Sequence, residues 1–381
     1  MVQSGQGSQL YNIAAQGRFQ AELFPNVTTR SGTLIFLHPP FEALPYLPLA
    51  YVPYPTAYAI CAIVNILLLL LTVVLLSPYL KELGALWRPL PLLMFLGFFP
   101  VFVDLLQGQD SIWLLFIFAL TFDSLKKGRA LRGGIFLGLG LFKFQYTLPF
   151  LIPVVLWRWW KVMAGLAISA AMMFLLSLPV AGFQGTLSYA PFLLDLTRKL
   201  STSNTVQNAA GIVSDTMPNI HGIVEMLIPN VPFPGIQKPL IVLLSGLAVL
   251  WLARQWPLGR SLSAKTIDLG FSLAIITSIL VSYHLLLHDL SLLLIPFILV
   301  LNGILKGEIC AGRRRAVAFG IITLFYLSPL YLLLMGHGRM YLFFWPILAF
   351  FVLLSWELVD LAKGREPAGR ENLPGPIADA T

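Results

Sequence analysis

A series of long apolar runs constrains this chain more than any other feature. An α-helix needs about 20 predominantly apolar residues to cross the roughly 30 Å of bilayer hydrocarbon. Only 11% of the residues are charged and 57% are hydrophobic, whereas soluble domains have about 25% charged residues. The sequence therefore predicts an all-α fold, a polytopic integral membrane helical bundle. The apolar runs lie near 57–77, 90–105, 111–125, 162–181, 238–254, 266–284, 290–305, 316–335 and 341–361.

Two shorter runs, GGIFLGLGLF and YTLPFLIPVVLW, lie between residues 125 and 162 and meet at KFQ. Neither is long enough to cross a bilayer comfortably alone. We expect a pair of short helices that meet at membrane depth, where protein or water must satisfy the backbone of the turn. Counting this pair as two gives about 11 membrane helices.

The basic residues predict the orientation of the bundle. Lys and Arg are enriched in cytoplasmic loops, and six basic segments together hold 18 of the 25 basic residues. Placing them in the cytoplasm predicts a multi-pass protein of the cell membrane and accounts for the net charge of +8 without a nucleic-acid partner. We expect an extracytoplasmic segment (1–56), a transmembrane domain (57–362) with an outer loop (182–237), and a disordered cytoplasmic tail (363–381).

Several function classes are excluded by the motifs that the sequence lacks. It has no P-loop, no GxGxxG followed by an acid, no HExxH and no GxSxG. The two cysteines, Cys61 and Cys310, have no metal-ligand spacing and make a disulfide framework unexpected. We therefore expect no metal, no cofactor and no ATP-driven transport by this chain alone.

Acidic and amide side chains interrupt the apolar sequence around LLQGQDSIWLLF (105–116). Asp104 lies within an apolar run, where a charge is costly and suggests function. Asp110 and Ser111 could cap the backbone of the next helix. Alternatively, Gln107, Gln109 and Asp110 offer hydroxyl-binding groups at the floor of a cavity. The sequence alone leaves both interpretations open.

Lys143, in LFKFQYTLPF, is placed at the turn between the two short helices. A buried ammonium needs an anion, and lipid phosphate is available at that depth. The alternative is that Lys143 extends to the membrane surface. Gln145 fits either interpretation.

Two histidines interrupt the apolar run VSYHLLLHDLSLLLIP (281–296). His284 and His288 would share a face if the segment is helical, and imidazolium is a natural phosphate partner near neutral pH. Asp289 could cap the helix that follows, but a cap does not explain two histidines. Arg339 in GHGRMYLF adds another anion-binding cation, and Asn219 in TMPNIHG has either a structural or a functional role.

Together these motifs resemble glycosyltransferase family 87, membrane enzymes of the GT-C superfamily that use polyprenyl-phosphate sugars. The resemblance rests on GQD…LLFIFAL, GRALRGGIFLGLGLFKFQ, HPP, MPNIHG and HDLSLLLIP, and covers most of residues 8–305. It implies a hexosyltransferase, typically a mannosyltransferase, with its site on the extracytoplasmic face. Phe144 stands where the family often has proline. The family's catalytic aspartate usually follows a first helix, and GSQLYN resembles what comes after it, so we expect both upstream of Met1.

The resemblance also implies a mechanism and partners. A carboxylate deprotonates the acceptor hydroxyl during an inverting attack on the anomeric carbon, and cations stabilise the departing phosphate. Asp104, Asp110 and Asp289 are the possible bases, and Lys143, His288 and Arg339, with His284 in reserve, are the phosphate ligands. The partners would be a polyprenyl-phosphate sugar, a lipid or glycan acceptor and membrane lipids. The alternative is a flippase for lipid-linked sugars or a proton-coupled secondary transporter, which intramembrane Lys, Asp and His would also suit.

Overall fold

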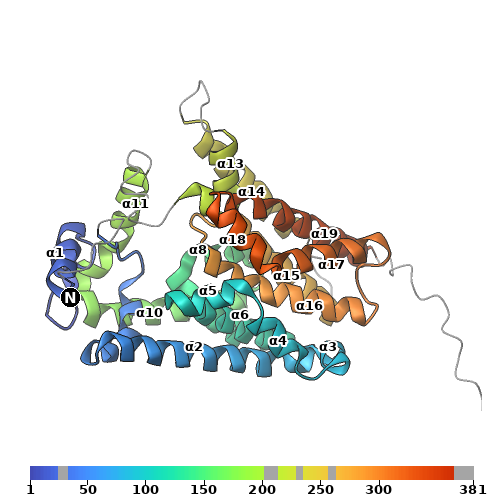
Figure 1. The fold of residues 1–381 in the computed structure, drawn as a ribbon, viewed down its shortest axis with the longest axis horizontal. Coiled ribbons are helices and arrows are strands. Elements are labelled where there is room, and N and C mark those ends of the chain that lie inside the picture. Colours follow the sequence, from blue (N-terminus) through green and yellow to red (C-terminus); the bar gives the residue numbers. More distant parts are fainter. Residues whose placement is uncertain (25–32, 201–212, 229–234, 256–262, 364–381) are drawn as a thin grey trace, which may run out of the picture.

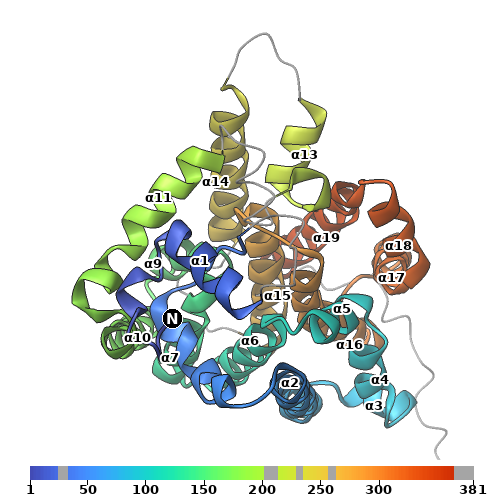
Figure 2. The same ribbon diagram turned by 60° about the vertical axis from the view of Figure 1, so that its left-hand side comes forward.

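The structure is a computed structural model that describes residues 1–24, 33–200, 213–228, 235–255 and 263–363. The predicted tail therefore lies outside the described residues from 364 onward. The described residues form helices and connecting loops without a β-strand (Figures 1 and 2), which confirms the predicted all-α class.

Six helical segments are long and apolar enough to cross a membrane, or up to eight if each of two bent pairs is one span. The chain is thus a multi-pass membrane protein, with fewer spans than the predicted 11. One reason is α6 (Ser111–Lys126), whose 16 residues cover only about 24 Å. The six segments are α2 (Tyr54–Leu76, extended to Tyr79), Ala130–Leu156, α10 (Trp160–Leu187), α14 (Gln237–Gln255), Leu287–Leu305 and Met340–Ala362. The bent pairs are α4 (Leu90–Leu96) with α5 (Phe99–Gln107) at 54°, and α17 (Arg313–Tyr326) with α18 (Ser328–Gly336) at 64°.

The bundle is centred on α6, α15 (Ala264–Val281) and the segment Leu287–Leu305, made of η7 (Leu287–Leu293) and α16 (Leu294–Leu305). Within the most apolar window of each span, 83% of the Leu287–Leu305 residues are buried but only 22% of the α2 residues. Leu287–Leu305 therefore packs against protein on nearly every side, whereas most of α2 is left to face lipid. Asp289, in the first turn of η7, is therefore held inside the protein.

Residues Ala130–Leu156 turn back on themselves. The segment consists of α7 (Ala130–Leu139), a 3-10 turn that ends at Lys143, α8 (Phe144–Thr147), a second 3-10 turn with Pro149, and α9 (Leu151–Leu156). Pro149 has no N–H to continue a regular helix. Leu125, Val154 and Trp157 line one small cavity, so the segment leaves the bundle at the end where it enters. The short pair predicted from the sequence corresponds to α7 and α9, with Lys143 at its tip.

The chemistry-bearing residues separate to two ends of the bundle. We call the end with Asp110, Lys143 and Asp289 the site end, and the end with Lys81, Lys126, Lys265 and Lys306 the lysine end. Asp110 precedes α6 and Lys126 closes it, so the ends are about 24 Å apart along that helix. Figure 1 shows α1 (Ile13–Leu23) and α11 (Tyr189–Leu200) at one end of α2 and α3 (Lys81–Leu86) at the other.

Candidate active site

Lys143 is buried at the site end between two aspartates. Its Nζ lies 2.6 Å from Asp110 Oδ1 and 2.7 Å from Asp289 Oδ1, and it donates to Ser111 Oγ at 2.7 Å. Ser111 in turn donates to Asp289 Oδ1 at 2.6 Å. Only 4% of Lys143 is exposed, so the ammonium does not extend to the surface. Two hydrogen bonds and the ion pair with Asp110 thus surround the ammonium.

The two aspartates reach Lys143 from different helix beginnings. Gly108 ends α5 in the left-handed conformation (φ 63°), which turns the chain so that Asp110 precedes α6. Asp110 occupies the N-cap position of α6, but its carboxylate makes no capping hydrogen bond. Asp289 Oδ2 accepts from Leu286 N–H at 3.0 Å at the start of η7, while its Oδ1 binds Lys143, a contact that the sequence did not predict.

His284 and His288 do not lie on one helix. The segment between them is not helical, because α15 ends at Val281 and η7 begins at Leu287. His288 is nevertheless close to the cluster: its Nε2 lies 3.7 Å from Asp289 Oδ1, and its Nδ1 is 3.1 Å from Gln107 Oε1. The expected shared helix face for the two histidines is therefore wrong, but both histidines line one cavity.

That cavity has a volume of about 480 Å³ and brings together six of the ten predicted site residues. Much of its remaining wall is apolar and comes from α11 and from the turn around Phe142 and Phe144. A hollow with apolar walls and a few buried polar groups is the usual form of a ligand site. The six predicted residues that line it are Gln109, Lys143, Gln145, His284, His288 and Asp289.

Four predicted residues lie elsewhere. Asp110 is behind the cavity wall, in contact with Lys143. Asp104 is fully buried, and neither of its carboxylate oxygens has a hydrogen-bond partner within the described residues. Asn219 caps α13 (Ile220–Leu227) by accepting from Gly222 N–H and also donates to the Ser282 carbonyl, which are structural contacts. Arg339 is exposed after α18 and does not belong to the described lining of the cavity.

Sequence reasoning missed Glu42 as a site residue, and it left His38 of the HPP motif open between a membrane-entry loop and a wall of the substrate site. His38 lines the cavity, and its Nδ1 is 2.6 Å from Glu42 Oε2. His38 precedes η2 (Pro40–Tyr51), a 3-10 helix that starts at the HPP motif, and Glu42 lies in the first turn of that helix. The His-x-x-x-Glu spacing was the available signal, but the prolines argued against any helical pairing of the two.

Burial and their mutual contact shift the pKa values of both Glu42 and His38. Burial raises the pKa of the Glu42 carboxyl to about 7, and the hydrogen bond with His38 offsets only part of this rise. Burial lowers the pKa of His38, but the hydrogen bond and charge of Glu42 outweigh it, so the net pKa is raised. A carboxyl with a pKa near neutrality is suited to accept and release protons.

One group of residues could hold a cation. His38, Glu42 and Asp110 each offer a ligand atom, and these atoms lie within 4.8 Å of one another. Lys143 Nζ, however, already places a positive charge 2.6 Å from Asp110. A metal ion there would be repelled by the ammonium, so the residues fit a proton-sharing group better than a metal centre.

The comparisons with known proteins give one match. The family model for glycosyltransferase family 87 matches residues 36–282, well over half of the chain, and the match includes the HPP motif, Asp110, Lys143 and Asn219. No curated protein and no solved structure matches the chain. Fold, buried charge cluster and family match agree: the chain is a membrane enzyme that belongs to glycosyltransferase family 87.

Proposed function

We propose that the enzyme transfers a hexose, mannose by family resemblance, from a polyprenyl-phosphate sugar to a lipid or glycan acceptor on the extracytoplasmic face. The observation that carries this proposal is the buried Lys143–Asp110–Asp289 cluster on the wall of a largely apolar cavity. An apolar wall suits the prenyl chain of the donor, and the polar groups suit its sugar phosphate.

The geometry supports a positioning role for Lys143. Its ammonium hydrogen-bonds Ser111 and Asp289 and forms an ion pair with Asp110, so its single charge is already matched by two carboxylates. The imidazoles of His284 and His288, which line the same cavity, are the groups suited to contact the phosphate. Lys143 then fixes the two carboxylates and adds positive potential where charge develops on the leaving group.

The base assignment follows from which carboxylate oxygens are engaged. Both oxygens of Asp289 accept hydrogen bonds, and Asp104 is fully buried away from the cavity lining. The Glu42–His38 pair is better suited, because burial places the pKa of Glu42 near neutrality and His38 lines the cavity. As the acceptor oxygen bonds to the anomeric carbon, its proton moves to this pair. The bond from that carbon to the phosphate oxygen breaks, and polyprenyl phosphate leaves with the bonding electrons.

A membrane assay with a polyprenyl-phosphate sugar tests the proposal. We expect His288→Ala to lower transfer about 10²-fold, the usual effect of losing one group that stabilises developing charge. Lys143→Ala should abolish transfer, because it also releases two buried carboxylates. His337→Ala is the matched control, an exposed histidine at the same end and outside the described cavity lining. Undiminished transfer in both site variants would reject the assignment. Uptake of sugar lipid without a covalent product would favour transport instead.

A further inference from the structure

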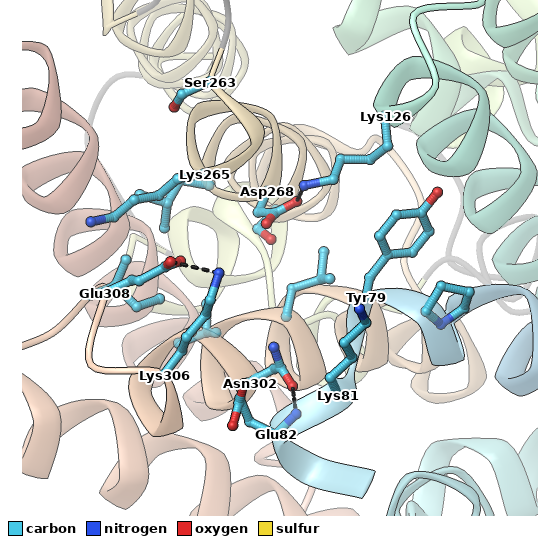
Figure 3. A pocket seen from close by; sticks show the side chains of 17 residues that line it. Tyr79, Lys81, Glu82, Lys126, Ser263, Lys265, Asp268, Asn302, Lys306 and Glu308 are labelled. Atoms are coloured by element: carbon cyan, nitrogen blue, oxygen red, sulfur yellow. Dashed lines mark hydrogen bonds and ion pairs between the residues drawn. The ribbon is translucent and has the colours of Figure 1, made fainter. Parts of the chain in front are cut away.

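A second cavity of about 480 Å³ lies at the lysine end, away from the site described above. It is formed by the loop before α3, the last residue of α6, the first half of α15 and the last half of α16, as Figure 3 shows. The helices α6, α15 and α16 therefore run from this cavity toward the site end of the bundle. Nothing in the proposed transfer reaction uses this second cavity.

Four lysines line this cavity, against three carboxylates. Lys126 lies 2.6 Å from Asp268, and Lys306 lies 2.6 Å from Glu308. Lys81 and Lys265 form no ion pair within the part of the chain that the structure describes. Figure 3 shows Lys126 directed toward Asp268 and Lys306 toward Glu308, whereas Lys265 points away from the space between Asp268 and Asn302. The lining therefore holds one more cation than carboxylates.

Some hydrogen-bond donors of the cavity also have no acceptor among the described residues. Asn302 Oδ1 already accepts from the backbone N–H groups of Glu82 and Leu83 at 3.0 and 3.2 Å. The carboxylates of Asp268 and Glu308 are engaged by lysines. Ser272 is fully buried, lines the cavity, and has a hydroxyl without a hydrogen-bond partner among the described residues. The donors of Lys81, Lys265 and Ser272 therefore remain for a ligand that supplies acceptor oxygens and negative charge.

We propose that this lysine-end cavity binds a phosphate monoester. Phosphate supplies several acceptor oxygens and up to two negative charges near neutral pH. The apolar part of the wall, from Leu269, Leu299, Val300 and Ile309, also fits the glycerol and first acyl carbons of a lipid that carries such a head group. The ligand is therefore either a soluble phosphate or the head group of an anionic membrane lipid.

The test uses the full chain, purified in a neutral detergent, with two probes. Inorganic phosphate is titrated by calorimetry, and phosphatidic acid is counted by native mass spectrometry against phosphatidylcholine. Binding of phosphate alone assigns the site to a soluble ligand, and binding of phosphatidic acid alone assigns it to a lipid head group. Binding of neither probe overturns the proposal.

Two variants place any binding in this cavity. Lys81→Gln with Lys265→Gln should weaken binding of the active probe by about tenfold or more, because charge-assisted hydrogen bonds are the strong ones. Lys161→Gln with Lys363→Gln removes two exposed lysines from the same end but outside the cavity lining, and should change the affinity less than about twofold. Ser272→Ala is a small change that preserves folding and should weaken binding several-fold. Equal affinity in the wild type, the Lys81/Lys265 variant and Ser272→Ala would show that the probe binds elsewhere.

Discussion

At the scale of single residues, the site contains carboxylates in three different environments. Asp289 is held by Lys143, Ser111 and a backbone N–H, Asp104 has no partner among the described residues, and Glu42 shares a hydrogen bond with His38. Groups of one chemical type acquire different roles when their surroundings separate their pKa values. Of these three, Glu42 has the environment suited to proton transfer near neutral pH.

The pH dependence of transfer should follow Glu42. A general base works only when ionised, and burial raises the pKa of Glu42 to about 7. We therefore expect kcat/KM to rise with pH up to about 7 and to level off above it. Glu42→Gln should lower kcat/KM by about 10²-fold or more and remove the rising limb.

A second histidine–glutamate pair supplies the control for this profile. His221 and Glu225 have the same i,i+4 spacing, with Nε2 3.0 Å from Oε1, but His221, unlike His38, does not belong to the described cavity lining. Glu225→Gln should therefore keep both the rate and the pH profile. An unchanged profile in Glu42→Gln would remove Glu42 from the mechanism.

Removal of metal ions tests whether His38, Glu42 and Asp110 bind a metal. Because Lys143 already lies 2.6 Å from Asp110, we expect transfer to continue in excess EDTA at an unchanged rate. Loss of activity in EDTA, with recovery on adding Mn²⁺ or Mg²⁺, would instead assign His38, Glu42 and Asp110 as metal ligands.

The sequence singled out Lys143 and Asp289 individually but did not single out Glu42. Lys143 and Asp289 interrupt apolar runs, where an unpaired charge is so costly that each indicates a partner. Glu42 lies in a proline-rich segment that carries no such expectation. The pairing of Lys143 with Asp289, 146 residues apart, required the fold, because nothing in either motif indicates that they meet.

At the scale of elements, the position of Lys143 depends on the close crossing of α7 and α10. A Cβ at Gly134 would lie 2.1 Å from Val162 O, and one at Gly165 would lie 2.2 Å from Leu131 O. Small residues let helix backbones approach in this way within membranes. The sequence predicted two short helices with a break at KFQ, but not this crossing, since glycine spacing does not identify the partner helix.

Gly134→Ala should therefore disturb both stability and catalysis. The new methyl group meets backbone rather than a flexible side chain, so α7 must move, which typically costs about 1–3 kcal/mol. We expect a lower thermal unfolding midpoint in detergent and reduced transfer, because α7 leads to Lys143. Gly320→Ala in α17, where a Cβ would meet open space, should keep activity and leave the midpoint equal or higher. Equal midpoints for the two variants would contradict the close crossing.

At the scale of the whole molecule, charge and chemistry separate to opposite ends of the bundle. Lysines from four of the six basic segments that predicted a cytoplasmic face line one cavity, and the candidate active site lies at the other end. The sequence predicted this grouping because it depends only on the order of apolar runs and basic loops. It overestimated the number of spans because apolar runs also form short, bent or central helices in a bundle.

Single-cysteine labelling tests the orientation of this arrangement. In a background of Cys61→Ser and Cys310→Ala, we choose Ser4→Cys at the site end and Lys161→Cys at the lysine end, both exposed positions. Ser4 belongs to the N-terminal segment whose Gly7 packs against Val180 near the site end of α10, and Lys161 lies in the first turn of that helix. A membrane-impermeant maleimide applied to intact cells should label Ser4→Cys alone, and Lys161→Cys should react only after permeabilisation. The reverse pattern would place the site in the cytoplasm and would contradict an extracytoplasmic sugar donor, since basic loops and the catalytic cavity cannot share one side of this bundle.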